Sequence, residues 1–198
     1  RLDNTPMFLK SWLEHQLRDE TWVQGSVCEE YDRIQVPVLA VSGWNDCWPN
    51  TVFRLLENVD APCRGVSGAW GHVYPNLGGP GPGIDFLGLA LAWWDRWLRD
   101  DDNGVMDAPS LLAYLQDSHS PTPMASARPG RWVAVSTWPS PEVSVRTLHL
   151  GPNGLDETAT VGIAKVEICS PVWTGLTSGE YMPIAGGREV ADEQGPDE

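Results

Sequence analysis

The chain carries a carboxylate and an imidazole at positions where they could act together. Asp46 follows the apolar run Val36–Val41, and His72 ends the later segment Gly68-Ala-Trp-Gly-His. A histidine can take up and return a proton near neutral pH, and a carboxylate can fix its tautomer and stabilise the imidazolium. In this order the two residues match the last two members of a Ser…Asp…His triad. The pattern therefore predicts acyl-transfer chemistry on esters or amides.

A serine that could complete this triad is not found in the sequence. An elbow serine needs glycine two residues away on each side, so that a strand and a helix can approach closely. Ser67 comes nearest, with Gly65 before it but Ala69 after it, and it follows Asp46 in the wrong chain order. We therefore expect the nucleophile to lie outside the 198 residues and the chain alone to be inactive.

A strand, a helix and a second strand would position both side chains. The continuous apolar run Val36–Val41 is typical of a strand buried on both faces of a parallel sheet, and Pro49 marks the start of a helix. Arg64–Ser67 reads as the second strand. Because parallel strands end at the same sheet edge, we expect Asp46 and His72 to meet there.

Asp46 and His72 could also have roles other than catalysis. Asp46 could cap the helix that begins near Pro49, and His72 could be a packed side chain beside Trp70. The two could also be metal ligands, but no third ligand stands at a sensible spacing, so we expect neither a metal nor a cofactor. The other histidines (His15, His119 and His149) have no comparable frame.

Two further segments have helical periodicity. One spans Met7 to Trp22, and the other spans Asp85 to Arg99 after the Gly- and Pro-rich loop Asn76–Gly83. The second has a wide apolar face, which predicts packing against the sheet on one side and another domain on the other. Its adjacent stripes are Leu87, Leu91, Trp94 and Leu98, and Phe86, Ala90, Trp93 and Trp97.

From about Leu111 the helical periodicity disappears. Short β-rich segments follow, separated by Pro, Gly, Ser and Asn, and they predict an antiparallel β-sandwich that is incomplete. These segments are Leu111–Leu115, Trp132–Val135, Val143–Leu150 and Val161–Ile168. The fold class expected for the whole chain is thus α/β followed by all-β.

Composition limits the partners of the chain. The net charge is −14, with no basic stripe to neutralise phosphates, so nucleic acid is not expected. The four cysteines fit neither a metal pattern nor a dense disulfide framework, and this favours a cytoplasmic location. No apolar run is long enough to cross a membrane.

The eleven tryptophans leave one alternative function open. The β-rich half could be a carbohydrate- or partner-binding module through Trp132, Trp138 and Trp173.

Several runs resemble those of the CocE/NonD hydrolases, the group of cocaine esterase, α-amino-acid ester hydrolases and X-Pro dipeptidyl-peptidases. The segment from Trp12 to Trp22 is similar to the end of that family's helical cap. The other matching runs are Tyr31–Asp46, Gly68–His72, Gly79–Gly83, Trp93–Leu98, and Pro129–Trp132 with Trp138-Pro139.

The resemblance implies an architecture and a set of roles. Residues 1–30 would end a helical cap, residues 31–108 would form the C-terminal part of an α/β-hydrolase domain, and residues 109–198 would begin a jelly-roll. Asp46 would be the triad acid and His72 the base, with the serine and an oxyanion-binding tyrosine upstream. The expected substrate is a small acyl ester or peptide, no membrane partner is implied, and a homo-oligomer is left open. Ala69 departs from the family, which usually has proline there.

Overall fold

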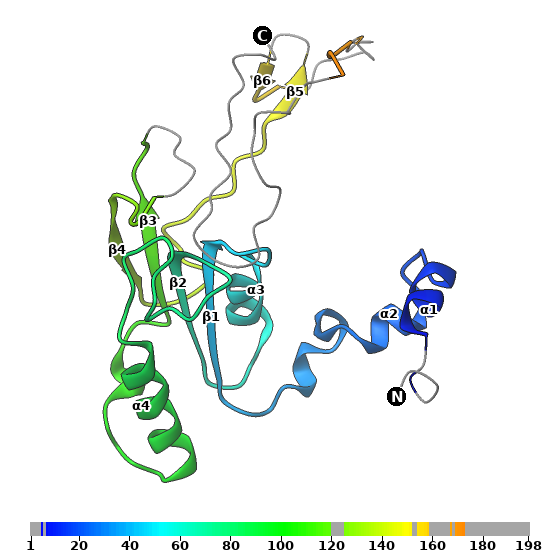
Figure 1. Cartoon of the computed structure of the whole chain (residues 1–198). Coiled ribbons are helices and arrows are strands. Elements are labelled where there is room, and N and C mark those ends of the chain that lie inside the picture. Colours follow the sequence, from blue (N-terminus) through cyan, green and yellow to red (C-terminus); the bar gives the residue numbers. More distant parts are fainter. Residues whose placement is uncertain are drawn as a thin grey trace.

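A four-stranded mixed sheet forms the centre of the structure (Figure 1). The structure is a computed structural model that describes residues 5, 7–119, 125–151, 154–158, 167 and 169–172. The strand order is β1-β2-β3-β4, and a separate two-stranded hairpin pairs β5 with β6. In the described part of the chain, no helix combines the length and the apolarity needed to cross a membrane.

The predicted strand–helix–strand unit is confirmed. β1 (Val38–Asn45) pairs in parallel with β2 (Cys63–Gly71), and α3 (Thr51–Asn58) crosses between them. Gly43 lies opposite Gly68, and the register shifts just beyond this pair, where both strands end. Both strands run further toward the site than the apolar runs alone predicted, to Asn45 in β1 and Gly71 in β2.

Helix α3 packs on one face of the sheet. Its apolar side chains join a core built around Ala40, Val52 and Leu111. A Cβ added at Gly65 of β2 would lie 2.6 Å from Val52 and 2.7 Å from Leu56, so this close approach of helix to sheet requires glycine there.

The strands after Leu111 differ from the expectation. We expected Leu111–Leu115 and Trp132–Val135 in an antiparallel sandwich, but β3 (Leu111–Gln116) runs parallel to β2 within the same sheet. β4 (Gly130–Val135) then pairs antiparallel to β3. The physical reason is that Leu111, 1% exposed, completes the core beneath α3. Expecting these two segments in a separate sandwich was therefore wrong.

Little of the predicted jelly-roll lies among the described residues. Of the predicted strand Val143–Leu150, only the end is a strand, in the hairpin of β5 (His149–Gly151) and β6 (Gly154–Asp156). The predicted strand Val161–Ile168 lies outside the described residues except for Glu167. The jelly-roll and the domain boundary near residue 109 therefore stay predictions.

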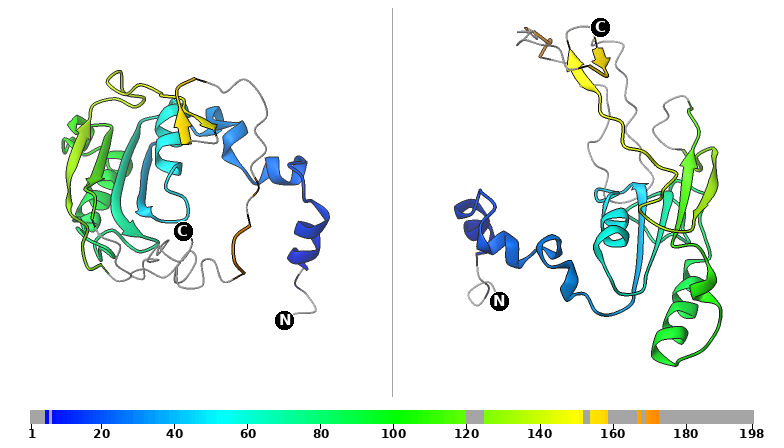
Figure 2. Two further views of the ribbon diagram at one scale, coloured as in Figure 1. Left: turned by 90° about the horizontal axis from the view of Figure 1, so that it is seen from above. Right: turned by 180° about the vertical axis from the view of Figure 1, so that it is seen from behind.

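The N-terminal helices stand apart from the sheet (Figures 1 and 2). One helix was predicted from Met7 to Trp22, but the structure has α1 (Phe8–Glu14) and α2 (Glu20–Gln24). The single helix is wrong because Asp19 accepts a hydrogen bond from the Thr21 N–H and starts a new helix. The 3₁₀ turns η2 (Val27–Glu29) and η3 (Tyr31–Arg33) lead from α2 to β1.

The predicted helix after the Gly- and Pro-rich loop is present as α4 (Phe86–Leu98), with Asp85 as its N-cap. Ala90 and Trp93 are buried, and the short η4 (Val105–Asp107) follows. Ala90 and Trp93 belong to one of the two apolar stripes of α4, and the residues of the other stripe are each more than half exposed. One side of α4 is therefore packed, and the described residues leave the other side uncovered. The exposed residues are Leu87, Leu91, Trp94 and Leu98.

Candidate active site

Asp46 and His72 are in contact where β1 and β2 end. His72 Nδ1 lies 3.1 Å from Asp46 Oδ2, which is a hydrogen-bond distance. The Asp46 side chain is 12% exposed and that of His72 is 49% exposed. The contact that the sequence predicts is therefore present, with a sheltered carboxylate and an imidazole open to one side.

The second oxygen of Asp46 is also used. Oδ1 accepts a hydrogen bond from the Trp48 backbone N–H at 3.2 Å and faces the Cys47 thiol at 3.4 Å. The alternative role of Asp46 as a helix cap is wrong, since Asn50 stands at the N-cap of α3. These contacts fix the carboxylate so that its other oxygen points at His72.

Two opposing effects set the pKa of the Asp46 carboxyl. Burial would raise this pKa, but hydrogen bonds with His72, the Trp48 N–H and the Cys47 thiol outweigh burial and hold the pKa below its ordinary value. Asp46 is therefore ionised at neutral pH. An ionised carboxylate only accepts hydrogen bonds, so the contact favours the tautomer with the proton on Nδ1.

His72 is not a packed core side chain, contrary to the simpler interpretation. Half of it is exposed, and its ring meets the Trp48 ring edge-on at a centroid distance of 5.5 Å. Because Nδ1 faces Asp46, Nε2 is the nitrogen that can exchange a proton with a reacting group.

A cavity of about 400 Å³ opens beside the pair. A second cavity of about 300 Å³, lined by Trp48 and Leu55 among others, also reaches both residues. A hydrogen bond from the Gly71 N–H to the Gly79 carbonyl joins the loop after His72 to the end of β2. The walls of the larger cavity are mainly apolar and aromatic: Val41, Ser42, Trp70, Val73, Tyr74, Pro75 and Phe86.

In the described part of the chain, no serine hydroxyl is hydrogen-bonded to His72. Ser42 lines both cavities, but its hydroxyl donates to the Trp48 carbonyl at 3.4 Å. Ser67 is 0% exposed, which agrees with its rejection as a nucleophile.

Comparison with known proteins shows which family the chain around Asp46 and His72 resembles. Residues 1–74, which include Asp46 and His72, match the family model for X-Pro dipeptidyl-peptidase (S15 family). Two crystal structures of a CocE/NonD family hydrolase from Staphylococcus aureus share the fold, with TM-scores of 0.59 and 0.58 at 16% and 17% identity. The resemblance to the CocE/NonD-type hydrolases is confirmed.

The likeness to the Staphylococcus aureus hydrolase covers 78% and 79% of this chain but only 26% and 27% of the two solved chains. The chain thus spans about a quarter of the length of these CocE/NonD hydrolases. A search of the curated proteins gave no match.

Cys47 is the residue near the Asp46–His72 pair that sequence reasoning missed. We expected no third ligand beside Asp46 and His72, but the three residues place one potential ligand atom each within 4.8 Å of one another. Partial burial and then the neighbouring Asp46 carboxylate raise the pKa of the Cys47 thiol. The position of Cys47 directly after Asp46 was the available signal.

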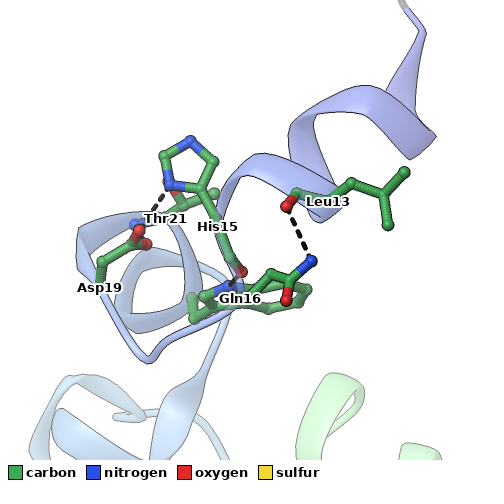
Figure 3. A network of polar contacts seen from close by, with 6 residues as sticks. Leu13, His15, Gln16, Asp19 and Thr21 are labelled. Atoms are coloured by element: carbon green, nitrogen blue, oxygen red, sulfur yellow. Dashed lines mark hydrogen bonds and ion pairs between the residues drawn. The ribbon is translucent and has the colours of Figure 1, made fainter.

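A second histidine–aspartate pair shows what distinguishes the first (Figure 3). His15 Nδ1 contacts Asp19 Oδ2, and Asp19 also caps α2 by accepting the Thr21 N–H. The hydrogen bond from His15 is the main reason that the pKa of Asp19 lies below its ordinary value. This pair joins residues four apart around a helix start, whereas Asp46 and His72 come from separate strands.

The tryptophans proposed for carbohydrate binding have other contacts. The centroid of the Trp132 ring lies 6.1 Å from that of the Trp70 ring and 5.1 Å from that of the Tyr114 ring. The centroids of the Trp138 and Phe53 rings lie 5.2 Å apart. Packing explains both rings without a sugar. Trp173 lies outside the described residues.

Proposed function

We propose that the chain supplies the acid and the base of a serine hydrolase that cleaves ester or amide bonds through an acyl-enzyme. The observation that carries this proposal is the 3.1 Å contact between His72 Nδ1 and Asp46 Oδ2 at the carboxyl ends of two parallel strands. The match of residues 1–74 to the S15 peptidase model supports it.

His72 would act as general base and then as general acid. Its Nε2 takes the proton of a serine hydroxyl while the serine oxygen bonds to the substrate carbonyl carbon. The imidazolium then gives this proton to the leaving alcohol or amine as the carbon–leaving-group bond breaks. Water repeats the sequence and releases the acid. The serine would lie outside the 198 residues.

Asp46 would hold His72 in the productive tautomer and stabilise the imidazolium. Its lowered pKa keeps it ionised throughout the neutral range, so the favourable charge interaction is available whenever His72 is protonated.

The cavity supports a small acyl ester or peptide as the substrate. The rings of Trp70, Tyr74 and Phe86 line it beside His72, and such a wall suits the apolar part of an acyl or leaving group. The polar groups that would select an ester, an amide or an X-Pro peptide are not among these residues.

A fluorophosphonate probe, which phosphonylates activated serines with loss of fluoride, tests the proposal. The 198-residue chain is expected to remain unlabelled and to leave p-nitrophenyl esters intact. A longer protein that carries this chain is expected to be labelled. There, His72→Ala should abolish labelling, while His15→Ala, which removes the other aspartate-paired histidine, should leave it unchanged.

Two results would contradict the proposal. Turnover by the 198-residue chain that disappears in His72→Ala would place the nucleophile inside the chain. Labelling of the longer protein that persists at the same rate in His72→Ala would remove His72 from the mechanism.

A further inference from the structure

Three different metal-ligating groups gather at the end of β1 and β2. Asp46 Oδ1 lies 3.4 Å from Cys47 Sγ, and Asp46 Oδ2 lies 3.1 Å from His72 Nδ1. One potential ligand atom from each residue lies within 4.8 Å of the others. Elsewhere among the described residues, no other group of three such side chains comes this close.

We propose that this chain binds one Zn²⁺ ion between Asp46, Cys47 and His72. Thiolate, imidazole and carboxylate are the three side-chain ligands that zinc takes in proteins. Three protein ligands with one open position are also the usual number at zinc sites that exchange a fourth ligand with solvent.

The dimensions of the cluster suit this ion. Zinc lies about 2.3 Å from sulfur and about 2.0–2.2 Å from nitrogen and oxygen, so its ligands stand roughly 3.3–3.8 Å from one another in a tetrahedron. One Asp46 oxygen faces each of the other two ligands: Oδ1 lies 3.4 Å from Cys47 Sγ, within that range, and Oδ2 lies 3.1 Å from His72 Nδ1, close to it. His72 is half exposed, so its ring has room to move the remaining distance.

The fourth position has access to solvent and to small molecules. Asp46 and His72 line both cavities at this edge of the sheet, of about 400 and 300 Å³. An ion held by these side chains could therefore enter without unfolding of β1 or β2, and water could complete its coordination.

Zinc binding would compete with the Asp46–His72 hydrogen bond. An ion coordinated by His72 Nδ1 and Asp46 stands where the Nδ1 proton lies in the free chain, so the two arrangements exclude each other. Inhibition of hydrolysis by zinc would follow from this, and that consequence rests on the proposed function. The binding itself does not depend on it.

Cobalt spectroscopy on the reduced, chelator-treated chain tests the binding directly. Co²⁺ should give near-ultraviolet thiolate-to-metal absorption and visible bands of tetrahedral cobalt, saturating at one ion per chain, and Zn²⁺ should abolish them. Cys47→Ser is expected to remove the thiolate absorption and to weaken zinc binding in equilibrium dialysis at least about tenfold. Cys63→Ser, a matched change at the far end of β2, should keep both signals.

A second variant guards against misfolding of Cys47→Ser. His72→Ala alters a half-exposed side chain and should weaken zinc binding while tryptophan fluorescence stays native. The inference fails if the unaltered chain shows no thiolate absorption with Co²⁺, if that absorption survives in Cys47→Ser, or if it disappears in Cys63→Ser. Because none of these signals needs a serine nucleophile, their failure is distinct from a failure of the proposed hydrolase function.

Discussion

The indole ring of Trp70 lies over Gly68, which precedes it by two positions on the same face of β2. A Cβ added at Gly68 would come within 2.1 Å of the ring, and one added at the paired Gly43 would come within 1.9 Å of the Trp70 carbonyl oxygen. Trp70 is 1% exposed and lines the larger cavity beside His72. The two glycines therefore allow this ring to form a wall of the site.

Gly68→Ala should destabilise the chain by about 1–3 kcal/mol, because the added methyl group would overlap the buried Trp70 ring and displace it. Urea unfolding followed by tryptophan fluorescence measures this loss. Gly25→Ala is the matched control, since its Cβ would meet only backbone atoms at 3.7 and 3.8 Å. Equal stability of the two variants would contradict the close packing of Trp70 on Gly68.

Ser67→Ala should leave the free energy of unfolding unchanged or raise it slightly. The Ser67 hydroxyl is fully buried and has no hydrogen-bond partner among the described residues, so its removal relieves a desolvated polar group. Chemical denaturation compares the variant with the unaltered chain. A loss of more than about 1 kcal/mol would show that the hydroxyl makes a stabilising hydrogen bond.

Asp46 should make stability depend on pH in the acid range. Its pKa in the folded chain lies below the ordinary 3.8, so its contribution is present above pH 3.8 and is lost as the pH falls through the folded value. Denaturation of the unaltered chain and of Asp46→Asn at a series of pH values measures this difference. The advantage of the unaltered chain should shrink only on the acid side of pH 3.8, and an advantage independent of pH would be contrary to it.

In a longer protein that carries this chain, Asp46→Asn should also lower the kcat of the proposed hydrolysis by about 10⁴-fold, because an amide can donate to Nδ1 and stabilise the wrong tautomer. The expected effect is mainly on kcat, with KM little changed. Asp19→Asn alters the other histidine-paired aspartate and serves as the control. Comparable losses in both variants would argue against a special role for the Asp46–His72 pair.

The arrangement around the candidate site could be predicted from the sequence. Val36–Val41 has no polar residue, which marks a strand buried on both faces, and Asp46 comes shortly after it. The crossover through α3 then brings the end of β2, and with it His72, to the same edge. Parallel direction places both strand ends at one edge, and the direct pairing of β1 with β2 then allows the contact.

Features that depend on tertiary packing were not predicted. The segment Leu111–Gln116 has the composition of a strand in any sheet, and only the space beneath α3 decides that it pairs with β2. A new helix, α2, starts after Asp19 because the Asp19 carboxylate accepts the Thr21 N–H, and the apolar periodicity does not report such a cap. Cys47 became a candidate ligand only once the fold brought His72 to its side.

The hydrogen bond between Asp46 and His72 is most directly tested by proton and nitrogen NMR of the His72 ring in the 198-residue chain. The His72 ring is expected to carry a proton on Nδ1 that is hydrogen-bonded to Asp46, seen as a strongly downfield resonance that is lost in Asp46→Asn and retained in Asp19→Asn. A His72 ring that carries its neutral proton on Nε2, with a spectrum unaffected by Asp46→Asn, would contradict it.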